Sequence, residues 1–291
     1  MSNNGPASER GLTMVVQCKT HCPHMSVRRN LPFGLGNFRM PRNAIGRRVD
    51  SVAKLLHIDK LLGRRPRQLS GGQRQLVAIG RAIVRKSIIF LFDESHSHLD
   101  AELRLQMRVE ISSLDAELGN KMIYVTHDQI EAMTVADGSV VLRDGNVEQI
   151  GKPLDFRNHP ANKFVAGFID APQMNFLSGT LGDSVLNFDS GMTRSASHSA
   201  AGSHKITFGI RQEEIEVSLE GDGNGQVEVR NFEQLGSLSN IYAGIPNGDT
   251  LSVQLDRQIP LQRGQITGFS YDTNIFHKFG EDGRVLEQAN G

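Results

Sequence analysis

Apolar positions in the first 170 residues alternate between short continuous runs and stripes at helical spacing. The runs cover 12–16, 88–92 and 122–125, lengths that are typical of strands. The stripes cover 49–61, 76–83 and 103–118 and predict helices. Because 88–92 has no polar position, we expect a strand buried on both faces of a parallel sheet. Alternating strands and helices predict an α/β domain.

The pattern changes after about residue 170. Helical periodicity fades, and short β-prone pieces at 205–210, 226–229 and 250–253 are separated by Gly, Asn, Asp and Ser. We expect residues 190–204 to form a flexible loop. The sequence therefore predicts two domains, an α/β domain over 1–170 and a β-rich domain over 171–291.

Length, charge and cysteine content narrow the class of protein. A chain of 291 residues is long enough for two cores. Residues 1–170 carry 24 basic and 17 acidic side chains, against 8 and 15 in 171–291, and a scattered basic excess of this kind marks either an anion-handling half or an ordinary solvated surface. Basic residues are not interleaved with aromatics, so a nucleic-acid partner is not favoured. The apolar runs are too short to span a bilayer, and only Cys18 and Cys22 are present, which predicts a cytoplasmic protein.

The sharpest chemical signal is Leu69-Ser70-Gly71-Gly72-Gln73 at the start of a predicted helix. Ser70 stands where a helix cap belongs, and two glycines let backbone N–H groups approach a phosphate closely. A plain glycine-containing turn between helices is the alternative, but five specified residues recur by chance with odds on the order of 10⁻⁴ in a chain of this length.

Polar side chains follow two of the predicted strands. Asp93 and Glu94 come directly after 88–92, where one carboxylate can hold Mg²⁺ and the other can accept a proton from an attacking water. His127 follows 122–125 and can donate a hydrogen bond to a terminal phosphate. Taken alone, an acidic pair at a strand end and a single histidine are more often structural.

These motifs, in this order along the chain, resemble the nucleotide-binding subunits of ABC transporters. The motifs are Gln17, Leu69 to Gln73, Phe90-Leu91-Phe92-Asp93-Glu94, Ser97-His98-Leu99-Asp100 and Tyr124-Val125-Thr126-His127-Asp128. Further segments resemble the maltose and glycerol-phosphate importer branch: Ala132-Met133-Thr134, Gly151-Lys152-Pro153, Phe164 to Ile169, Met174 to Leu177 and Gly209-Ile210-Arg211. The resemblance implies a P-loop-NTPase-like ABC ATPase domain followed by an OB-like regulatory and dimerisation domain.

The resemblance also implies roles for individual residues. It assigns Glu94 as general base and His127 to the γ-phosphate of ATP. It assigns Asp93 and Gln17 to Mg²⁺, with Gln17 also sensing the membrane subunit. The residues expected to contact nucleotide or the dimer partner are Gln17, Ser70, Gly71, Gly72, Gln73 and Asp100.

The implied assembly contains several other proteins. We expect a second ABC ATPase subunit, two transmembrane permease subunits and an extracytoplasmic solute-binding protein, with this chain peripheral on the cytoplasmic face of the inner membrane. ATP and Mg²⁺ are the expected cofactors. The transported solute cannot be read from the sequence, because specificity in such systems lies in the other subunits.

The sequence departs from the family pattern at three places. It contains no G-x-x-x-x-G-K-[S/T] phosphate loop, so we expect an ABC domain that lacks its N-terminal strands. Ser95 stands where the family has proline, and Cys18 to Cys22 replace the aromatics that seat a permease. Zinc binding by Cys18, His21, Cys22 and His24 is disfavoured by their crowded spacing. A catalytically incompetent remnant or a regulatory partner of an intact ABC ATPase is therefore the alternative function.

Overall fold

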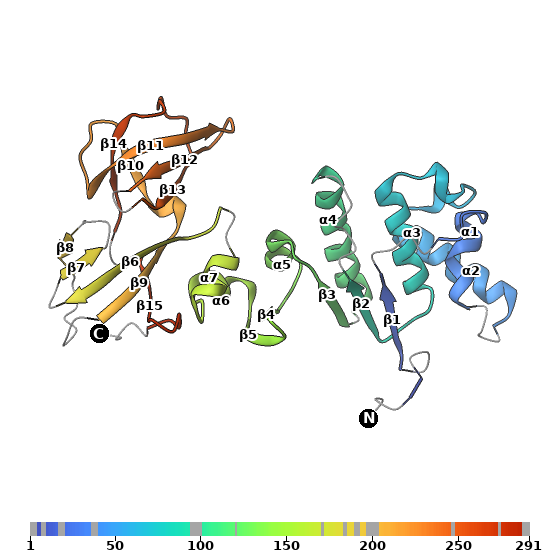
Figure 1. The fold of residues 1–291 in the computed structure, drawn as a ribbon. Coiled ribbons are helices and arrows are strands. Elements are labelled where there is room, and N and C mark those ends of the chain that lie inside the picture. The colour runs from blue at the N-terminus through green and yellow to red at the C-terminus, as the bar shows by residue number, and fades with distance from the viewer. Residues whose placement is uncertain are drawn as a thin grey trace. The chain divides into compact units, whose positions relative to one another are not determined.

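The computed structural model divides the chain into two compact units, Met1–Ala136 and Asp137–Gly291 (Figure 1). The structure describes residues 5–6, 10–16, 21–35, 40–93, 101–119, 121–169, 172–182, 185–188, 193–195, 204–245, 248–272 and 275–286. The division falls earlier than the boundary predicted after residue 170, and the assignment of domains to 1–170 and 171–291 stays a prediction.

The first unit is a three-stranded parallel sheet with helices packed against it. The strands lie in the order β1-β2-β3, and residues at the same level include Phe92 with Tyr124 and Asp93 with Val125. Its elements are β1 (Leu12–Val15), α1 (Val27–Asn30), η2 (Leu31–Leu35), α2 (Arg42–Leu55), η3 (Asp59–Leu61), η4 (Pro66–Gln68), α3 (Gly71–Ile83), β2 (Ile89–Asp93), α4 (Ala101–Leu118), β3 (Lys121–Val125) and α5 (Gln129–Thr134).

One face of this sheet forms the core of the unit. Phe90 and Phe92 of β2 are buried together with apolar residues of α2, α3 and α4. The opposite face carries exposed apolar side chains, because Met14, Ile123 and Val125 are each at least half exposed. In the described part of the chain, the expectation that 88–92 is buried on both faces is therefore wrong: Ile89 and Leu91 are only partly covered.

The first unit contains a close contact between helices. Gly72 in α3 is buried, and a Cβ at this position would lie 2.5 Å from Leu103 Cδ1 of α4. A side chain there would force Leu103 to move or the two helices to separate, so glycine permits this close contact. The start of α3 thus lies beside the start of α4.

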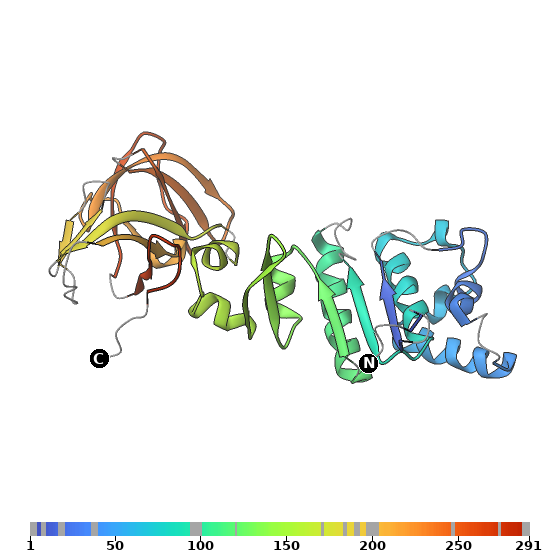
Figure 2. The ribbon, with the colours of Figure 1, turned by 60° about the horizontal axis from the view of Figure 1, so that its bottom comes forward.

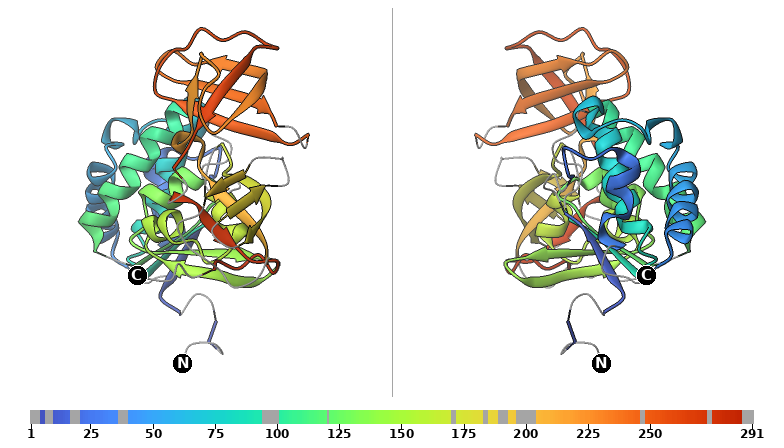
Figure 3. Two further views of the ribbon diagram at one scale, coloured as in Figure 1. Left: turned by 90° about the vertical axis from the view of Figure 1, so that its left-hand side faces the viewer. Right: turned by 90° about the vertical axis from the view of Figure 1, so that its right-hand side faces the viewer.

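The second unit begins with an antiparallel hairpin and two short helices and continues as two sheets. Figure 3 shows the hairpin, drawn in green. The elements are β4 (Ser139–Arg143), β5 (Asn146–Gly151), α6 (Pro153–Asn158), α7 (Lys163–Phe168), β6 (Asn175–Gly182), β7 (Val185–Phe188), β8 (Thr193–Ser195), β9 (His204–Ile210), η5 (Gln212–Glu214), β10 (Glu216–Ser218), β11 (Gly225–Gln234), β12 (Ser239–Gly244), β13 (Thr250–Leu255), β14 (Ile266–Ser270) and β15 (His277–Phe279).

The two sheets of the second unit share one core. Their strand orders are β10-β14-β11-β12-β13 and β15-β9-β6-β7-β8. Phe208 of β9, Val229 of β11 and Phe269 of β14 belong to the same buried cluster, so the core lies between the sheets (Figure 2). The predicted β-rich character is present. The stretch 190–204, expected as a loop, contains β8 and the first residue of β9, and its other residues lie outside the described ranges.

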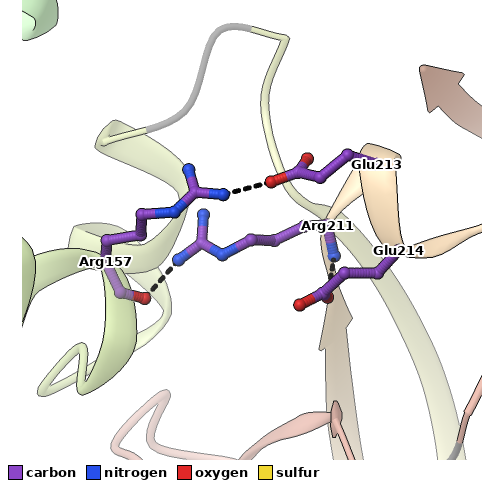
Figure 4. Close-up of polar contacts among 4 residues, drawn as sticks. All are labelled: Arg157, Arg211, Glu213 and Glu214. Atoms are coloured by element: carbon purple, nitrogen blue, oxygen red, sulfur yellow. Dashed lines mark hydrogen bonds and ion pairs between the residues drawn. The ribbon is translucent and has the colours of Figure 1, made fainter. Parts of the chain in front are cut away.

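A buried arginine joins α6 to the sheet that contains β9 (Figure 4). Arg211, at the end of β9, is 3% exposed and donates from its guanidinium to the backbone carbonyl of Arg157 in the last turn of α6. Arg157 in turn forms an ion pair with Glu213, and the backbone N–H of Arg211 donates to Glu214 Oε2 at 3.1 Å. Burial lowers the pKa of Arg211 and raises that of Glu214. This cluster fixes α6 against β9, which gives the Gly209-Ile210-Arg211 segment a structural role.

Candidate functional site

The start of α3 presents a closed reciprocal cap. Ser70 Oγ accepts from the backbone N–H of Gln73 at 3.3 Å, and Gln73 Oε1 accepts from the backbone N–H of Ser70 at 3.1 Å. Ser70 itself is exposed. Because a first helical turn has N–H groups without intrahelical acceptors, and because the helix dipole adds partial positive charge, this tip attracts an anion.

The glycines of the motif differ in their surroundings. Gly71 is half-buried, whereas Gly72 is buried against Leu103. Gly71 is therefore the glycine whose backbone a ligand can approach, and Gly72 has a packing reason to lack a side chain. The contact with Leu103 could not be predicted from the sequence, because it joins two separate helices.

The neighbouring ends of β2 and β3 form a second group of candidate residues. Asp93 is the last residue of β2, and it lies level with Val125 at the end of β3, two residues before His127. Asp93 is half-buried and His127 is exposed. Ligands of parallel α/β sheets bind beyond the carboxyl ends of strands, so both side chains stand at the edge where such a ligand is expected.

Three of the predicted site residues fall outside the described ranges. These are Gln17, Glu94 and Asp100. Gln17 follows β1 by two residues, Glu94 follows β2 directly, and Asp100 precedes α4 directly. In sequence, all three therefore adjoin elements that the structure describes.

A hydrogen-bond network flanks His127, and sequence reasoning missed its central residue. Glu131 is 3% exposed, and its Oε2 accepts from Tyr124 Oη at 2.9 Å and from Thr126 Oγ1 at 2.7 Å. Asp128 caps α5, accepting from the backbone N–H groups of Ile130 at 2.9 Å and Glu131 at 3.2 Å. The spacing of Asp128 and Glu131 was the available signal, but it reads as an ordinary helix start.

The backbone from Cys22 to Ser26 is held by one buried side chain. Asn30 is fully buried; its amide nitrogen donates to the carbonyls of Cys22, Met25 and Ser26, and its amide oxygen accepts from the backbone N–H of Cys22.

The described residues contain no group of three or more His, Cys, Asp or Glu side chains suited to a metal ion, and Cys18 lies outside them. None of the described helices has the length and apolarity to cross a membrane.

Comparison with known proteins supports one family. The model of the family described as "ABC transporter" matches residues 2–97. The chain is 43% identical over 287 residues to the sn-glycerol-3-phosphate import ATP-binding protein UgpC of Brucella abortus, covering 97% of this chain and 80% of that protein. It is 44% identical over 266 residues to the lactose transport ATP-binding protein LacK of Rhizobium radiobacter, covering 88% and 73%.

A solved structure also aligns with part of the chain. It is cbiO1 from Clostridium perfringens, described as part of an ABC transporter complex, at 27% identity and a TM-score of 0.48. The alignment covers 50% of this chain and 59% of that chain. The relatives above, and not this partial likeness, carry the family assignment.

Proposed function

This chain belongs to the family of ABC transporter ATP-binding proteins, and from that premise we propose that it is the ATP-binding, energy-coupling subunit of an importer for a sugar-like solute. The observation that carries the proposal is the capped start of α3, where Ser70 and Gln73 hold an anion-attracting helix tip open to solvent. Two relatives with import or transport names, for glycerol phosphate and for lactose, support the solute class.

In this proposal the α3 tip meets nucleotide that a second ABC subunit holds. The 291 residues contain no G-x-x-x-x-G-K-[S/T] loop, whereas phosphoryl transfer needs a backbone cradle and a lysine around the β- and γ-phosphates. A partner that has this loop supplies the cradle. Ser70, Gly71, Gly72 and Gln73 then face the terminal phosphate from the opposite side.

The strand-end residues take the chemical roles. Asp93 offers a half-buried carboxylate, which suits Mg²⁺ because this ion is commonly held by one or two carboxylates together with water and phosphate oxygens. Mg²⁺, when bound with ATP, neutralises charge on the phosphates. Glu94 acts as general base and His127 donates to the γ-phosphate, while Gln17 contacts Mg²⁺ and the membrane subunit and Asp100 contacts the dimer partner.

The remaining parts of the proposal concern assembly. The subunit works with a second ATPase subunit, two permease subunits and a solute-binding protein, at the cytoplasmic face of the membrane. The β-rich part after residue 170 serves as an OB-like regulatory and dimerisation domain. Its shared two-sheet core supports a self-contained module.

A mixed ATPase assay tests the proposal. The full chain is combined with an ABC importer ATPase that has a complete phosphate loop but whose own signature serine is replaced, so that turnover requires α3 of this chain. We expect stimulation of ATP hydrolysis and crosslinking of a photoreactive ATP analogue near Ser70. Absence of both would refute the proposal.

Two substitutions at one position separate folding from nucleotide contact. Asn and Asp both cap helices well, so Ser70→Asn and Ser70→Asp preserve the helix start. Only Asp places a negative charge against the phosphate, and a unit charge about 4 Å away is worth about 4 kcal/mol near a protein surface. We therefore expect stimulation to fall at least about tenfold further in Ser70→Asp than in Ser70→Asn. Equal stimulation would contradict contact with nucleotide.

The absence of the phosphate-loop motif from these residues also favours a second candidate function. The chain would be a regulatory partner of an intact ABC ATPase and would not support turnover. The same assay distinguishes the two, because a regulatory partner binds the complete subunit and changes its own ATPase rate without restoring activity to a partner that lacks its signature serine.

A further inference from the structure

The turn that carries His127 is held by hydrogen bonds from both sides. It joins the end of β3 at Val125 to the start of α5 at Gln129. The His127 side chain is exposed, so packing alone does not determine where the turn presents it. Thr126 Oγ1 accepts from the backbone N–H of Asp128 at 2.9 Å and therefore bridges the residues before and after His127.

Glu131 completes this bridge in an unusual way. Asp128 is the cap of α5, so Glu131 occupies the third helical position, where glutamate commonly accepts from the backbone N–H of the cap residue. Here Thr126 Oγ1 takes that N–H, and the Thr126 hydroxyl donates to Glu131 Oε2 at 2.7 Å. The capping interaction is thus relayed through Thr126, around His127.

The same carboxylate oxygen connects the turn to the strand ends. Tyr124 Oη donates to Glu131 Oε2 at 2.9 Å, and the ring of Tyr124 packs against Phe92 with centroids 5.9 Å apart. Phe92 directly precedes Asp93. Burying the Glu131 carboxylate to 3% exposure costs free energy unless the carboxylate accepts hydrogen bonds. Its bonds from Tyr124 and Thr126 offset this cost and align β3, α5 and the turn between them.

We propose that Glu131 is a positioning residue for His127, acting through Thr126 and Tyr124. This inference rests on the proposed function, in which His127 contacts the terminal phosphate. Glu131 does not touch nucleotide itself. It fixes the backbone on both sides of His127, so that the imidazole is already oriented when nucleotide arrives.

A matched pair of threonine substitutions tests the relay. Thr126→Val removes the bridging hydroxyl. Thr134→Val is the matched control: it removes a hydroxyl at the end of α5 that donates to the backbone carbonyl of Ile130 at 2.6 Å and takes no part in the Thr126–Glu131 relay. Glu131→Ala and Glu131→Gln complete the set, and Gln retains an acceptor at the same place.

The readouts are amide exchange of Asp128 and the imidazole NMR signals of His127 in the full chain, assigned with His127→Gln. We expect Thr126→Val and Glu131→Ala to speed exchange at Asp128 at least about tenfold and to shift the His127 signals, with Glu131→Gln closer to wild type and Thr134→Val unchanged. His127 signals that do not move in Thr126→Val would overturn the inference, and this holds even if Glu131→Ala fails to fold.

The mixed ATPase assay serves as a control for folding, because the partner lacks only its signature serine and takes only α3 from this chain. Thr126→Val and Glu131→Gln are therefore expected to keep the stimulation of ATP hydrolysis. Its loss in both variants would show a general effect on folding and would overturn the inference. If wild-type chain gives no stimulation, the proposed function fails, and the NMR result alone decides the role of Glu131.

Discussion

Gly72 lies in the candidate nucleotide motif and also in a tight helix contact, and substitution can separate these two roles. A Cβ at Gly72 would lie 2.5 Å from Leu103 Cδ1, closer than real Cβ contacts allow, and 3.0 Å from Leu103 Cγ, which is tighter than most real Cβ contacts. Leu103 must move, or α3 and α4 must separate. Overpacking of this kind costs about 1–3 kcal/mol. Alanine recovers at most about 1 kcal/mol through its higher helix propensity.

The expected net effect of Gly72→Ala is a loss of about 0–2 kcal/mol of unfolding free energy. In a Leu103→Ala background the clash disappears, so Gly72→Ala becomes neutral or stabilising. The coupling energy between the two positions is then about 1–3 kcal/mol. Gly46 in α2 is the matched control, because nothing lies within 4 Å of a Cβ there, and Gly46→Ala is expected to stabilise by about 1 kcal/mol.

Urea unfolding followed by ellipticity at 222 nm measures these effects. The long helices α2, α3 and α4 belong to the first unit, so this signal follows the unit that contains the substitutions. If Gly72→Ala changes stability by the same amount, within about 0.5 kcal/mol, with and without Leu103, the packing argument is wrong. If the Gly72→Ala, Leu103→Ala double variant is as stable as Leu103→Ala alone but still loses ATP crosslinking, the loss reports nucleotide contact at Gly72 and not a folding defect.

Three further predictions concern the core, the loop and the second unit. Gly80→Ala should lower stability by about 1–3 kcal/mol, because its Cβ would lie 2.6 Å from the fully buried Leu31, and an unchanged urea midpoint would contradict this. Asn30→Ala should cost about 2–3 kcal/mol, because three carbonyls each lose a side-chain donor, and should speed amide exchange at Cys22, because its N–H loses its acceptor; retained protection would argue against it. His277 has its pKa lowered to about 4, chiefly by burial. Between pH 4 and about 6.5 the unfolded chain binds the proton that the folded chain excludes, so stability should fall on acidification through this window, less steeply in His277→Gln; equal slopes would refute the assignment.

The sequence was sufficient for the elements whose signal is local. The strand at 12–16 appears as Leu12–Val15, the stripe at 103–118 appears within Ala101–Leu118, and Ser70 caps a helix as its position indicated. The fold class also followed from the alternation of these elements. The stripe at 49–61 is only partly one helix, because α2 runs from Arg42 to Leu55, His57 then takes a positive φ, and η3 follows at Asp59–Leu61.

Features that depend on distant contacts could not be predicted. An apolar run does not reveal whether helices cover one face or two, which is why the burial of 88–92 was misjudged. The two roles of the glycine pair differ only because Leu103 lies against Gly72. Glu131 resembled a common helix-start residue, and its bonds to Tyr124 and Thr126 become visible only when β3 and α5 are placed together.

The uncovered face of the β1–β3 sheet has a practical consequence at the bench. In the described part of the first unit, this face exposes the apolar side chains of Met14, Ile123 and Val125. The purified chain is therefore expected to bind hydrophobic resin, to raise the fluorescence of a dye that reports apolar surface, and to show light scattering that increases with protein concentration. Mild detergent should suppress all three behaviours, so its presence has to be matched across every variant before their stabilities are compared.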